Sequence, residues 1–464
     1  MTANQLPITE GSLLDFPRDP IACMRRLYRQ HGDVAALQEG QQQIVFSFSP
    51  RYNQQVLTET DVFHSRFFSI RGPKSSSQRR LTCGLLSMNG NDHRRHRRMV
   101  MGPFSKKSIE GYCPSLGELT DEMLADWTPG EVRNIFPDMT RLMLRITSTI
   151  LFGFDQKELS VSIGKKIENW VDMNHELGIG ALLPCDTFTQ KYEDLLRLAG
   201  ELETEIMKMI DLRRSSTDEA NDVLSILIRS ADAQGALTDE ELIGQAAILF
   251  GAAHLTTANT LTWTLFLLAQ HPTIMRELMQ EIHQVLPDGR PPRLEQLPQL
   301  NMMERVIKES MRVMPASSYS QRVTNERTQL GPLDLPRGTA VIFSQFITHH
   351  REDLYEDPEA FRPERWLHIK PSPYEYLPFA AGPRMCIGTS LAMMTLKIAL
   401  PTILRRFRLT VVPDSRISGL VTSTMLTPTT SIPMQIAEQD GRFEAVPVTG
   451  NIHEMVDLRE MPRG

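Results

Sequence analysis

Hydrophobic positions along most of the chain recur at the three- and four-residue spacing of helices. Residues 17–34 have a first amphipathic pattern of this kind, and the spacing from about Leu116 to Arg229 is mostly helical. Short strand-like runs lie near Ile44–Phe48, Leu330–Phe343, Leu409–Val412 and Ser431–Ile436. We therefore expect a mainly α protein with a smaller β-rich portion. We expect a single domain over residues 1–464, with residues 440–464 as an irregular surface tail.

The longest predicted helix has clear signals at both ends. Thr238 precedes Glu241 by three residues, which is the spacing of a capping box. The pattern continues to Gln270, where a following His-Pro pair is able to end a helix. Such a helix is about 45–50 Å long. Residues 248–257 are apolar on nearly every face, so we expect the middle of this helix to cross the interior.

Composition excludes several classes of protein. With 50 basic and 56 acidic residues, the net charge is -6, so nucleic acid is not expected as the main partner. We see neither a signal peptide nor a run of about 20 apolar residues, and we expect a cytoplasmic protein without a membrane span. The cysteines form no C-x-x-C pair, which argues against a disulfide framework or a cysteine zinc site: Cys23, Cys83, Cys113, Cys185 and Cys386.

One short segment has the composition of a reactive cysteine site. In FAAGPRMCIG, residues 379–388, two glycines bracket Cys386 and an arginine precedes it by two positions. Backbone N–H groups turned toward the sulfur, with a positive charge nearby, favour thiolate over thiol. A buried structural cysteine in a turn remains the alternative interpretation of this segment alone.

A second pattern pairs opposite charges. Glu309 and Arg312 are three residues apart on a predicted helix that ends near Pro315, so both project from one face. Arg365 follows in a proline-punctuated turn. By itself, such a pair is more often a solvated surface bridge, worth under about 1 kcal/mol.

Together these motifs resemble the cytochrome P-450 family, in its soluble, bacterial form. The heme-binding signature F-x-x-G-x-R-x-C-x-G is matched at every fixed position, and the E-x-x-R pair and the later arginine follow the family order. The matching residues are Phe379, Gly382, Arg384, Cys386 and Gly388, then Glu309, Arg312 and Arg365.

The resemblance implies a heme b (iron protoporphyrin IX) between the long central helix and the helix that follows the cysteine loop. Cys386 would be the proximal thiolate ligand of the iron, and Phe379 and Gly388 would border the heme in the same loop. The Glu309–Arg312–Arg365 network would brace this loop. His93 and Arg97 match an H-x-x-x-R pattern of the family and would contact the heme propionates. Arg384 and Arg322 would contact them as well.

On the oxygen side, the family carries A-G-x-(D/E)-T-T, and residues 252–257 correspond to it. Thr256 matches the catalytic threonine. The usual glycine is Ala253, and the usual acid is Leu255, which is unable to relay a proton. We expect protons to travel through Thr256, water and either His254 or a substrate group.

The implied activity is monooxygenation of a hydrophobic small molecule such as a lipid, terpenoid or other natural product. Electrons would come from a ferredoxin or flavodoxin-type donor with its NAD(P)H reductase. The substrate pocket is expected to include Phe67, Phe68, Ala252, Leu255, Ser318 and Thr430. Because of Leu255, a peroxide-using hydroxylase or a non-oxygenating isomerase or dehydratase is the main alternative. A heme or ligand carrier without catalysis is a further alternative.

Overall fold

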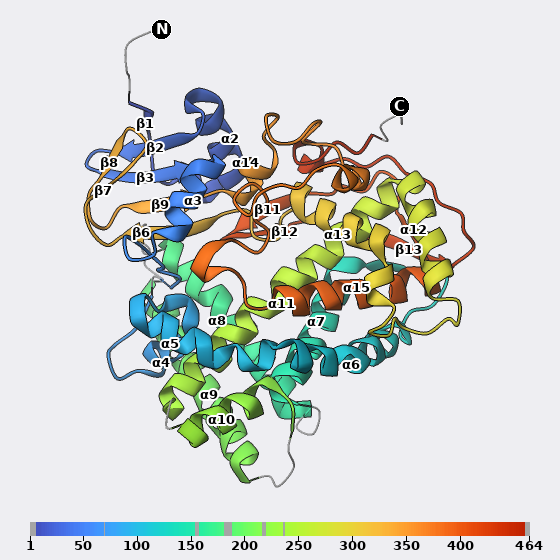
Figure 1. The fold of residues 1–464 in the computed structure, drawn as a ribbon, viewed down its shortest axis with the longest axis horizontal. Coiled ribbons are helices and arrows are strands. Elements are labelled where there is room, and N and C mark those ends of the chain that lie inside the picture. Colours follow the sequence, from blue (N-terminus) through green and yellow to red (C-terminus); the bar gives the residue numbers. More distant parts are fainter. Residues whose placement is uncertain are drawn as a thin grey trace. The chain divides into compact units, whose positions relative to one another are not determined.

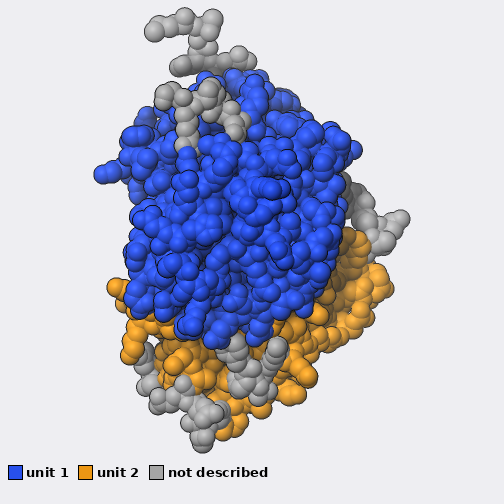
Figure 2. Space-filling view, turned by 90° about the vertical axis from the view of Figure 1, so that its right-hand side faces the viewer, with its two compact units in different colours: residues 1–64, 113–142, 256–464 blue, residues 65–112, 143–255 orange. Residues whose placement is uncertain are grey.

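The structure is a computed structural model that describes residues 6–68, 70–153, 157–180, 188–215, 220–234 and 237–459. The chain divides into two compact units, coloured separately in Figure 2. The first unit comprises residues 1–64, 113–142 and 256–464, and the second comprises residues 65–112 and 143–255. Cys185 and residues 460–464 lie outside the described residues. The expectation of a single domain over the whole chain stays a prediction.

The largest sheet lies in the first unit and joins segments from the two ends of the chain. Its strand order is β1-β2-β3-β9-β6-β4, in which β3 is parallel to β9 and antiparallel to β2. Figure 1 shows blue strands from the N-terminal region beside orange strands from near residue 340. The strand bounds are β1 (Ile8–Glu10), β2 (Val34–Glu39), β3 (Gln42–Ser47), β4 (Phe63–His64), β6 (Ser320–Thr324) and β9 (Ala340–Phe343).

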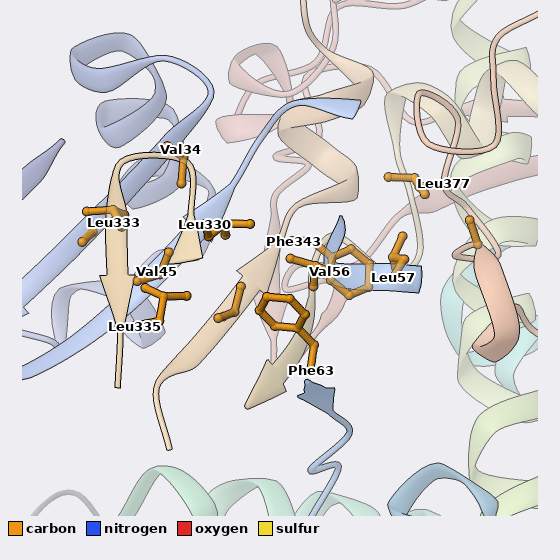
Figure 3. Close-up of a cluster of buried hydrophobic side chains, with 13 residues drawn as sticks. Val34, Val45, Val56, Leu57, Phe63, Leu330, Leu333, Leu335, Phe343 and Leu377 are labelled. Atoms are coloured by element: carbon orange, nitrogen blue, oxygen red, sulfur yellow. The ribbon is translucent and has the colours of Figure 1, made fainter. Parts of the chain in front are cut away.

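One face of this sheet is covered by a hydrophobic cluster (Figure 3). Val45 and Phe343 come from the sheet, while Val56 and Leu57 come from the short helix α3 (Pro50–Thr58). Full burial of one such side chain contributes about 1.5–3 kcal/mol relative to exposure. The cluster also includes Leu377, nine residues before Cys386, and so holds the segment that leads into the cysteine loop.

Three smaller sheets complete the β portion. They are β10-β13-β5, the hairpin β11–β12 and the hairpin β7–β8. The strand-like runs near 44–48, 330–343, 409–412 and 431–436 are confirmed as strands, whereas β5, β11 and β12 were not predicted. Their bounds are β5 (Val132–Asn134), β7 (Thr328–Leu330), β8 (Leu333–Leu335), β10 (Phe407–Val411), β11 (Gly419–Thr422), β12 (Met425–Pro428) and β13 (Pro433–Glu438).

The predicted first helix is present as α2 (Pro20–His31). Asp19 accepts a hydrogen bond from the Ala22 N–H at 3.0 Å, and proline occupies the first turn, where its missing N–H costs nothing. Gly32, with φ of 76°, follows the last turn. The other helices of the first unit are α1 (Asp15–Arg18), α12 (Pro272–Val285), α13 (Asn301–Val313), α14 (Gln345–His349) and α15 (Thr389–Arg406).

The second unit is helical, and α8 packs along α9 within it. The short helix α4 is anchored by Gln78, which accepts a hydrogen bond from Trp170 Nε1 and donates one to Asn174 Oδ1, each at 2.6 Å. The helices of this unit are α4 (Ser77–Leu81), α5 (Gly90–Val100), α8 (Lys157–Gly180), α9 (Phe188–Ser215) and α10 (Val223–Gln234). Three helices have residues in both units: α6 (Lys106–Leu124), α7 (Ile135–Phe152) and α11 (Asp239–Gln270).

The long central helix is α11, with 32 residues. The predicted capping box is confirmed, because the Thr238 N–H donates to Glu241 Oε2 at 2.9 Å and the Glu241 N–H donates to Thr238 Oγ1 at 3.2 Å. The predicted end at Gln270 is confirmed as well. Across the residues described, no helix combines the length and apolar character that a membrane crossing requires.

The C-terminal segment differs from the expected surface tail. Residues 440–459 contain little regular structure, apart from one 3₁₀ turn at Asn451–Glu454. Ile452, Met455 and Val456 are nevertheless buried, with at most 4% of each exposed. These apolar positions are separated by polar residues, which concealed their burial in the sequence pattern. The segment is therefore packed against the first unit up to residue 457.

Candidate active site

The cysteine loop lies between Leu377 and the start of α15. The Cys386 N–H donates to the Phe379 carbonyl at 2.9 Å, and Thr389 Oγ1 donates to the Cys386 carbonyl at 2.9 Å. These bonds fix the backbone on both sides of the thiol. Cys386 is exposed, so the alternative of a buried structural cysteine is wrong for the described structure.

The two glycines of this loop have different physical roles. Gly382 has a φ of 72°, and an added Cβ would lie 2.7 Å from the Leu57 carbonyl oxygen. Only glycine meets both demands without strain. Gly388 has an ordinary φ of -83°, and an added Cβ there would contact Cys386 Sγ at 3.8 Å. Gly382 thus permits the turn, whereas Gly388 leaves space beside the sulfur.

Glu309 is the centre of a fully buried charge network. Arg312 donates to both of its carboxylate oxygens, at 3.0 and 2.8 Å, and Arg365 Nε donates at 2.9 Å. Both Glu309 and Arg312 are 0% exposed, so the surface-bridge alternative is wrong. Trp366 Nε1 adds a further bond to Glu309 at 2.9 Å. Sequence reasoning missed Trp366, although it directly follows the predicted Arg365.

The protonation of Glu309 follows from these partners. Burial by itself raises the pKa of the carboxyl group, but the charges and hydrogen bonds of Arg312 and Arg365 outweigh it and hold the pKa below its usual value. Glu309 is therefore ionised, and the network is ionic.

The network reaches the cysteine loop through the residues just before it. On α13, the Lys308 carbonyl accepts a hydrogen bond from the Tyr376 hydroxyl at 2.9 Å. Arg312 donates to the carbonyl of His349 at 2.8 Å, and His349 Nε2 accepts from the Leu377 N–H at 2.8 Å. Two residues that lead into the loop are thus held by α13 and by the end of α14.

Two arginines near the cysteine loop could bind the carboxylates of a cofactor such as heme. Arg322 on β6 is 8% exposed, and its Nε has no hydrogen-bond partner among the described residues. Burial, together with the positive charge of Arg384, lowers the pKa of Arg322 to about 9. A buried cation beside a second cation is costly unless an anion joins them. An exposed thiol and a buried arginine whose Nε lacks an acceptor among the described residues fit a heme with acidic propionates.

His93 and Arg97 lie one turn apart on α5, in the second unit, as their spacing predicts. His93 is 6% exposed and Arg97 is partly buried. The other arginines of this helix are exposed, in agreement with a solvated basic face: Arg94, Arg95 and Arg98. Arg95 pairs with Glu241 at 2.8 Å. The role of His93 and Arg97 toward propionates stays a prediction.

The middle of α11 contains an accessible stretch. Residues 242–250 and 257–270 are buried throughout, whereas Ala252 is exposed and Leu255 and Thr256 are partly exposed. This turn is therefore a solvent-accessible part of a helix that is buried on both sides of it. The residues that match the oxygen-binding motif of the family occupy this turn.

The remaining predicted pocket residues have contrasting environments. Phe67 is 42% exposed, whereas Phe68 is 2% exposed and packs on Trp170 with ring centroids 4.9 Å apart. Ser318 is fully buried, and its N–H donates to the Thr424 carbonyl at 2.8 Å. The Thr430 hydroxyl accepts from the Ser418 N–H at 2.9 Å. Ser318 and Thr430 therefore hold opposite ends of the β11–β12 hairpin.

That hairpin is bonded to α11 through residues of which Asn259, Trp263 and Leu426 were not predicted as site residues. Asn259 Nδ2 donates to Thr427 Oγ1 at 3.2 Å, and Trp263 Nε1 donates to the Leu426 carbonyl at 3.0 Å. The Leu426 N–H donates to the Ala316 carbonyl at 3.0 Å. A buried asparagine three residues after the motif threonine was the available signal.

Comparisons with known proteins agree with these observations. The sequence model of the family described as cytochrome P-450 matches residues 6–434. Cyclooctat-9-en-7-ol 5-monooxygenase of Streptomyces melanosporofaciens is 32% identical over 397 residues, covering 83% of this chain and 84% of that protein. Pentalenene oxygenase of Streptomyces avermitilis is 30% identical, covering 90% of this chain and 93% of that protein.

Solved structures support the fold. A cyanobacterial protein with bound retinoic acid superposes with a TM-score of 0.77 at 22% identity, covering 92% of this chain and 96% of that one. A cytochrome P-450 heme domain superposes with a TM-score of 0.78 at 21% identity, covering 91% and 94%. The expected fold is thereby confirmed.

Proposed function

Because the chain belongs to the cytochrome P-450 family and is a monooxygenase of that family, we propose that it oxidises a terpenoid. One atom of dioxygen enters a C–H bond of the substrate as a hydroxyl group, and the other leaves as water. Two electrons and two protons complete the balance. The electrons come from NAD(P)H through a separate reductase and a ferredoxin or flavodoxin-type donor, in the cytoplasm.

The observation that carries this proposal is the exposed Cys386 thiol in a backbone-fixed loop that the Glu309 network braces. The family implies a heme-thiolate cofactor, and heme b is the form that we propose. When bound through a thiolate, heme supplies the iron that activates dioxygen. Cys386 would hold it as the thiolate ligand, and Arg322, Arg384, His93 and Arg97 would neutralise its two propionates.

The side chains on the accessible turn of α11 control water and protons. The Thr256 hydroxyl would hold a water molecule by hydrogen bonding and relay protons, accepting one proton for each one that it donates. Leu255 neither accepts nor donates a proton, so the water chain depends on Thr256, on His254 or on a polar group of the substrate. Ala252 and Leu255 offer an apolar surface that fits a hydrocarbon substrate.

The terpenoid assignment is supported by the relatives. The enzymes from both Streptomyces species are named for oxygenation of terpene-derived compounds, and they span most of this chain. An apolar helix turn that ends in the hydroxyl of Thr256 is the expected lining for a mostly hydrocarbon ligand with few polar groups.

The proposal is tested with the purified holoprotein and Cys386→Ser. We expect the wild type, when reduced and exposed to carbon monoxide, to show the absorption band of a thiolate-ligated heme, and the variant to lose it. Addition of pentalenene, as a terpene probe, should displace the sixth ligand and shift the heme absorption band. An unaltered carbon monoxide spectrum in Cys386→Ser would overturn the ligand assignment.

Leu255 favours a second candidate function, a peroxide-using hydroxylase or a non-oxygenating isomerase or dehydratase. Peroxide brings its own protons and electrons, so an acidic relay residue is dispensable for it. Turnover driven by hydrogen peroxide is compared with turnover driven by a ferredoxin, its reductase and NADPH. Faster turnover with peroxide would replace the monooxygenase proposal by this one, and a product of unchanged oxidation state would indicate an isomerase or dehydratase.

A further inference from the structure

The segment 447–457, here called the C-terminal strap, runs along the residues that lead into the β11–β12 hairpin. The Asp414 N–H donates to the Pro447 carbonyl at 2.8 Å, and the Ile417 N–H donates to the Thr449 carbonyl at 2.8 Å. Gly450 has a φ of 105°, and an added Cβ there would overlap the Ile417 carbonyl oxygen. The two backbones therefore approach more closely than any side chain at position 450 allows.

Asn451 clamps the first residue of the hairpin. The Gly419 N–H donates to Asn451 Oδ1 at 2.9 Å, and Asn451 Nδ2 donates to the Gly419 carbonyl at 2.8 Å. A side-chain amide thus bonds both polar groups of one residue, as a neighbouring strand would. Because one partner only donates and the other only accepts, a single orientation of the amide satisfies both.

The far end of the strap is fixed to the braced part of the first unit. Ile452 and Val456 are buried, and the Asp457 N–H donates to the Glu359 carbonyl at 2.8 Å. The next residue, Ala360, accepts a hydrogen bond from Arg312 at 2.9 Å through its carbonyl. The strap therefore connects the root of the hairpin to the Glu309 network.

The same end of the hairpin lies beside α11, because Thr427 pairs with Leu420, the residue after Gly419. Thr427 accepts the hydrogen bond from Asn259, and Asn259 follows Thr256 by three residues on that helix. Residues three apart lie on neighbouring positions of one helix face. The position of the hairpin therefore determines which groups lie beside the accessible turn of α11.

We propose that Asn451 is a positioning residue, which fixes the hairpin and thereby determines which carbon of the substrate is presented for oxidation. This inference rests on the proposed monooxygenase function. The family match ends at residue 434, so the strap lies beyond the matched part. Its role is therefore argued from this chain and not from the family pattern. Asn451 acts through Gly419 and the hairpin, not through contact with the substrate.

The test compares Asn451→Ala and Asn451→Asp with the control Thr449→Ala, all as heme-loaded full-length protein. Asn451→Asp has the same shape but lacks the donor to the Gly419 carbonyl. Thr449 lies in the strap, has an exposed side chain and is bonded here through its backbone. Hydrogen exchange of peptides that contain residues 417–428 reports the hairpin without any substrate.

We expect exchange in the hairpin to accelerate roughly tenfold in both Asn451 variants, as for the loss of one to two hydrogen bonds, and to be unchanged in Thr449→Ala. Binding of 4-phenylimidazole and of pentalenene, measured by the heme absorption shift, should weaken by a similar factor. Any oxidised pentalenene should be spread over more positions.

Wild-type exchange rates in both Asn451 variants would overturn the proposal, and so would equal acceleration in Thr449→Ala. Unchanged product ratios with faster exchange would also overturn it, because a mobile hairpin would then not determine the oxidised carbon. If pentalenene binds to no variant, including the wild type, the proposed substrate class fails. Exchange and 4-phenylimidazole binding then still decide whether Asn451 positions the hairpin.

Discussion

Replacement of Glu309 by glutamine tests whether the buried network stabilises the fold as an ionic unit. The carboxylate accepts hydrogen bonds from Arg312, Arg365, Trp366 and the Arg362 N–H within 3.0 Å, at 0% exposure. Glutamine replaces one acceptor oxygen by an NH₂ group and leaves two guanidinium groups without a counterion. Loss of one partner of a buried pair costs about 3–5 kcal/mol.

The control is Glu304→Gln on the same helix. Glu304 pairs with Lys308 and Lys397, each at 2.7 Å, but its side chain is 37% exposed. An exposed pair contributes about 0–1 kcal/mol. Urea unfolding, followed by tryptophan fluorescence and heme absorption, should therefore separate the two variants by at least about 2 kcal/mol. Equal destabilisation, or a loss below about 1 kcal/mol for Glu309→Gln, would refute the reasoning.

The pH dependence provides an independent check. The pKa of Glu309 is lowered in the folded state from 4.5, because the arginines outweigh burial. The free energy of folding that the ionised Glu309 contributes is thus present above pH 4.5 and is lost as the pH falls through the pKa of Glu309 in the folded state. The difference in stability between wild type and Glu309→Gln should shrink below pH 4.5. A difference that stays constant into acid would show that the charge is not responsible.

Three further predictions concern other parts of the molecule. Leu255→Glu should raise the fraction of NADPH electrons recovered in product relative to Leu255→Gln; an equal fraction would mean that the missing acid is irrelevant. Gly382→Ala should destabilise the apoprotein by about 1–3 kcal/mol, since the φ of 72° disfavours a side chain, and Gly388→Ala should cost less than about 1 kcal/mol in the same urea titration. Burial lowers the pKa of His175 from 6.5 to about 4, so wild-type stability should fall as the pH drops from 6.5 toward 4, and His175→Asn should flatten that slope.

Local signals predicted the parts of the structure that local geometry determines. The capping box at Thr238 fixes the start of α11, and the three-residue spacing of Glu309 and Arg312 places both on one face of α13. The turn around Gly382 follows from a glycine and a proline in sequence. In each case the interacting groups are neighbours along the chain, so a spacing rule is sufficient.

Pairings between residues far apart in the sequence could not be predicted from local patterns. Strands β1, β2, β11 and β12 are three to six residues long, and their partners decide whether such short runs are strands. Asn451 lies between a glycine and a buried isoleucine, a pattern typical of a turn. Its partner Gly419 is 32 residues away, and no periodicity in the sequence joins the two positions.

The contrast between Glu309 and Leu255 indicates where this chain is free to vary. Arg312 and Arg365, the two cationic partners of Glu309, are buried, so a change at Glu309 costs folding free energy whatever reaction is catalysed. Leu255 lies on the accessible turn of α11, where replacement of an acid by leucine leaves no buried charge unpaired. Under the proposed function, a departure from the family pattern at that turn would change the delivery of protons at little cost in stability. The difference between dioxygen-driven and peroxide-driven chemistry is therefore expected to depend on the accessible turn and not on the braced cysteine loop.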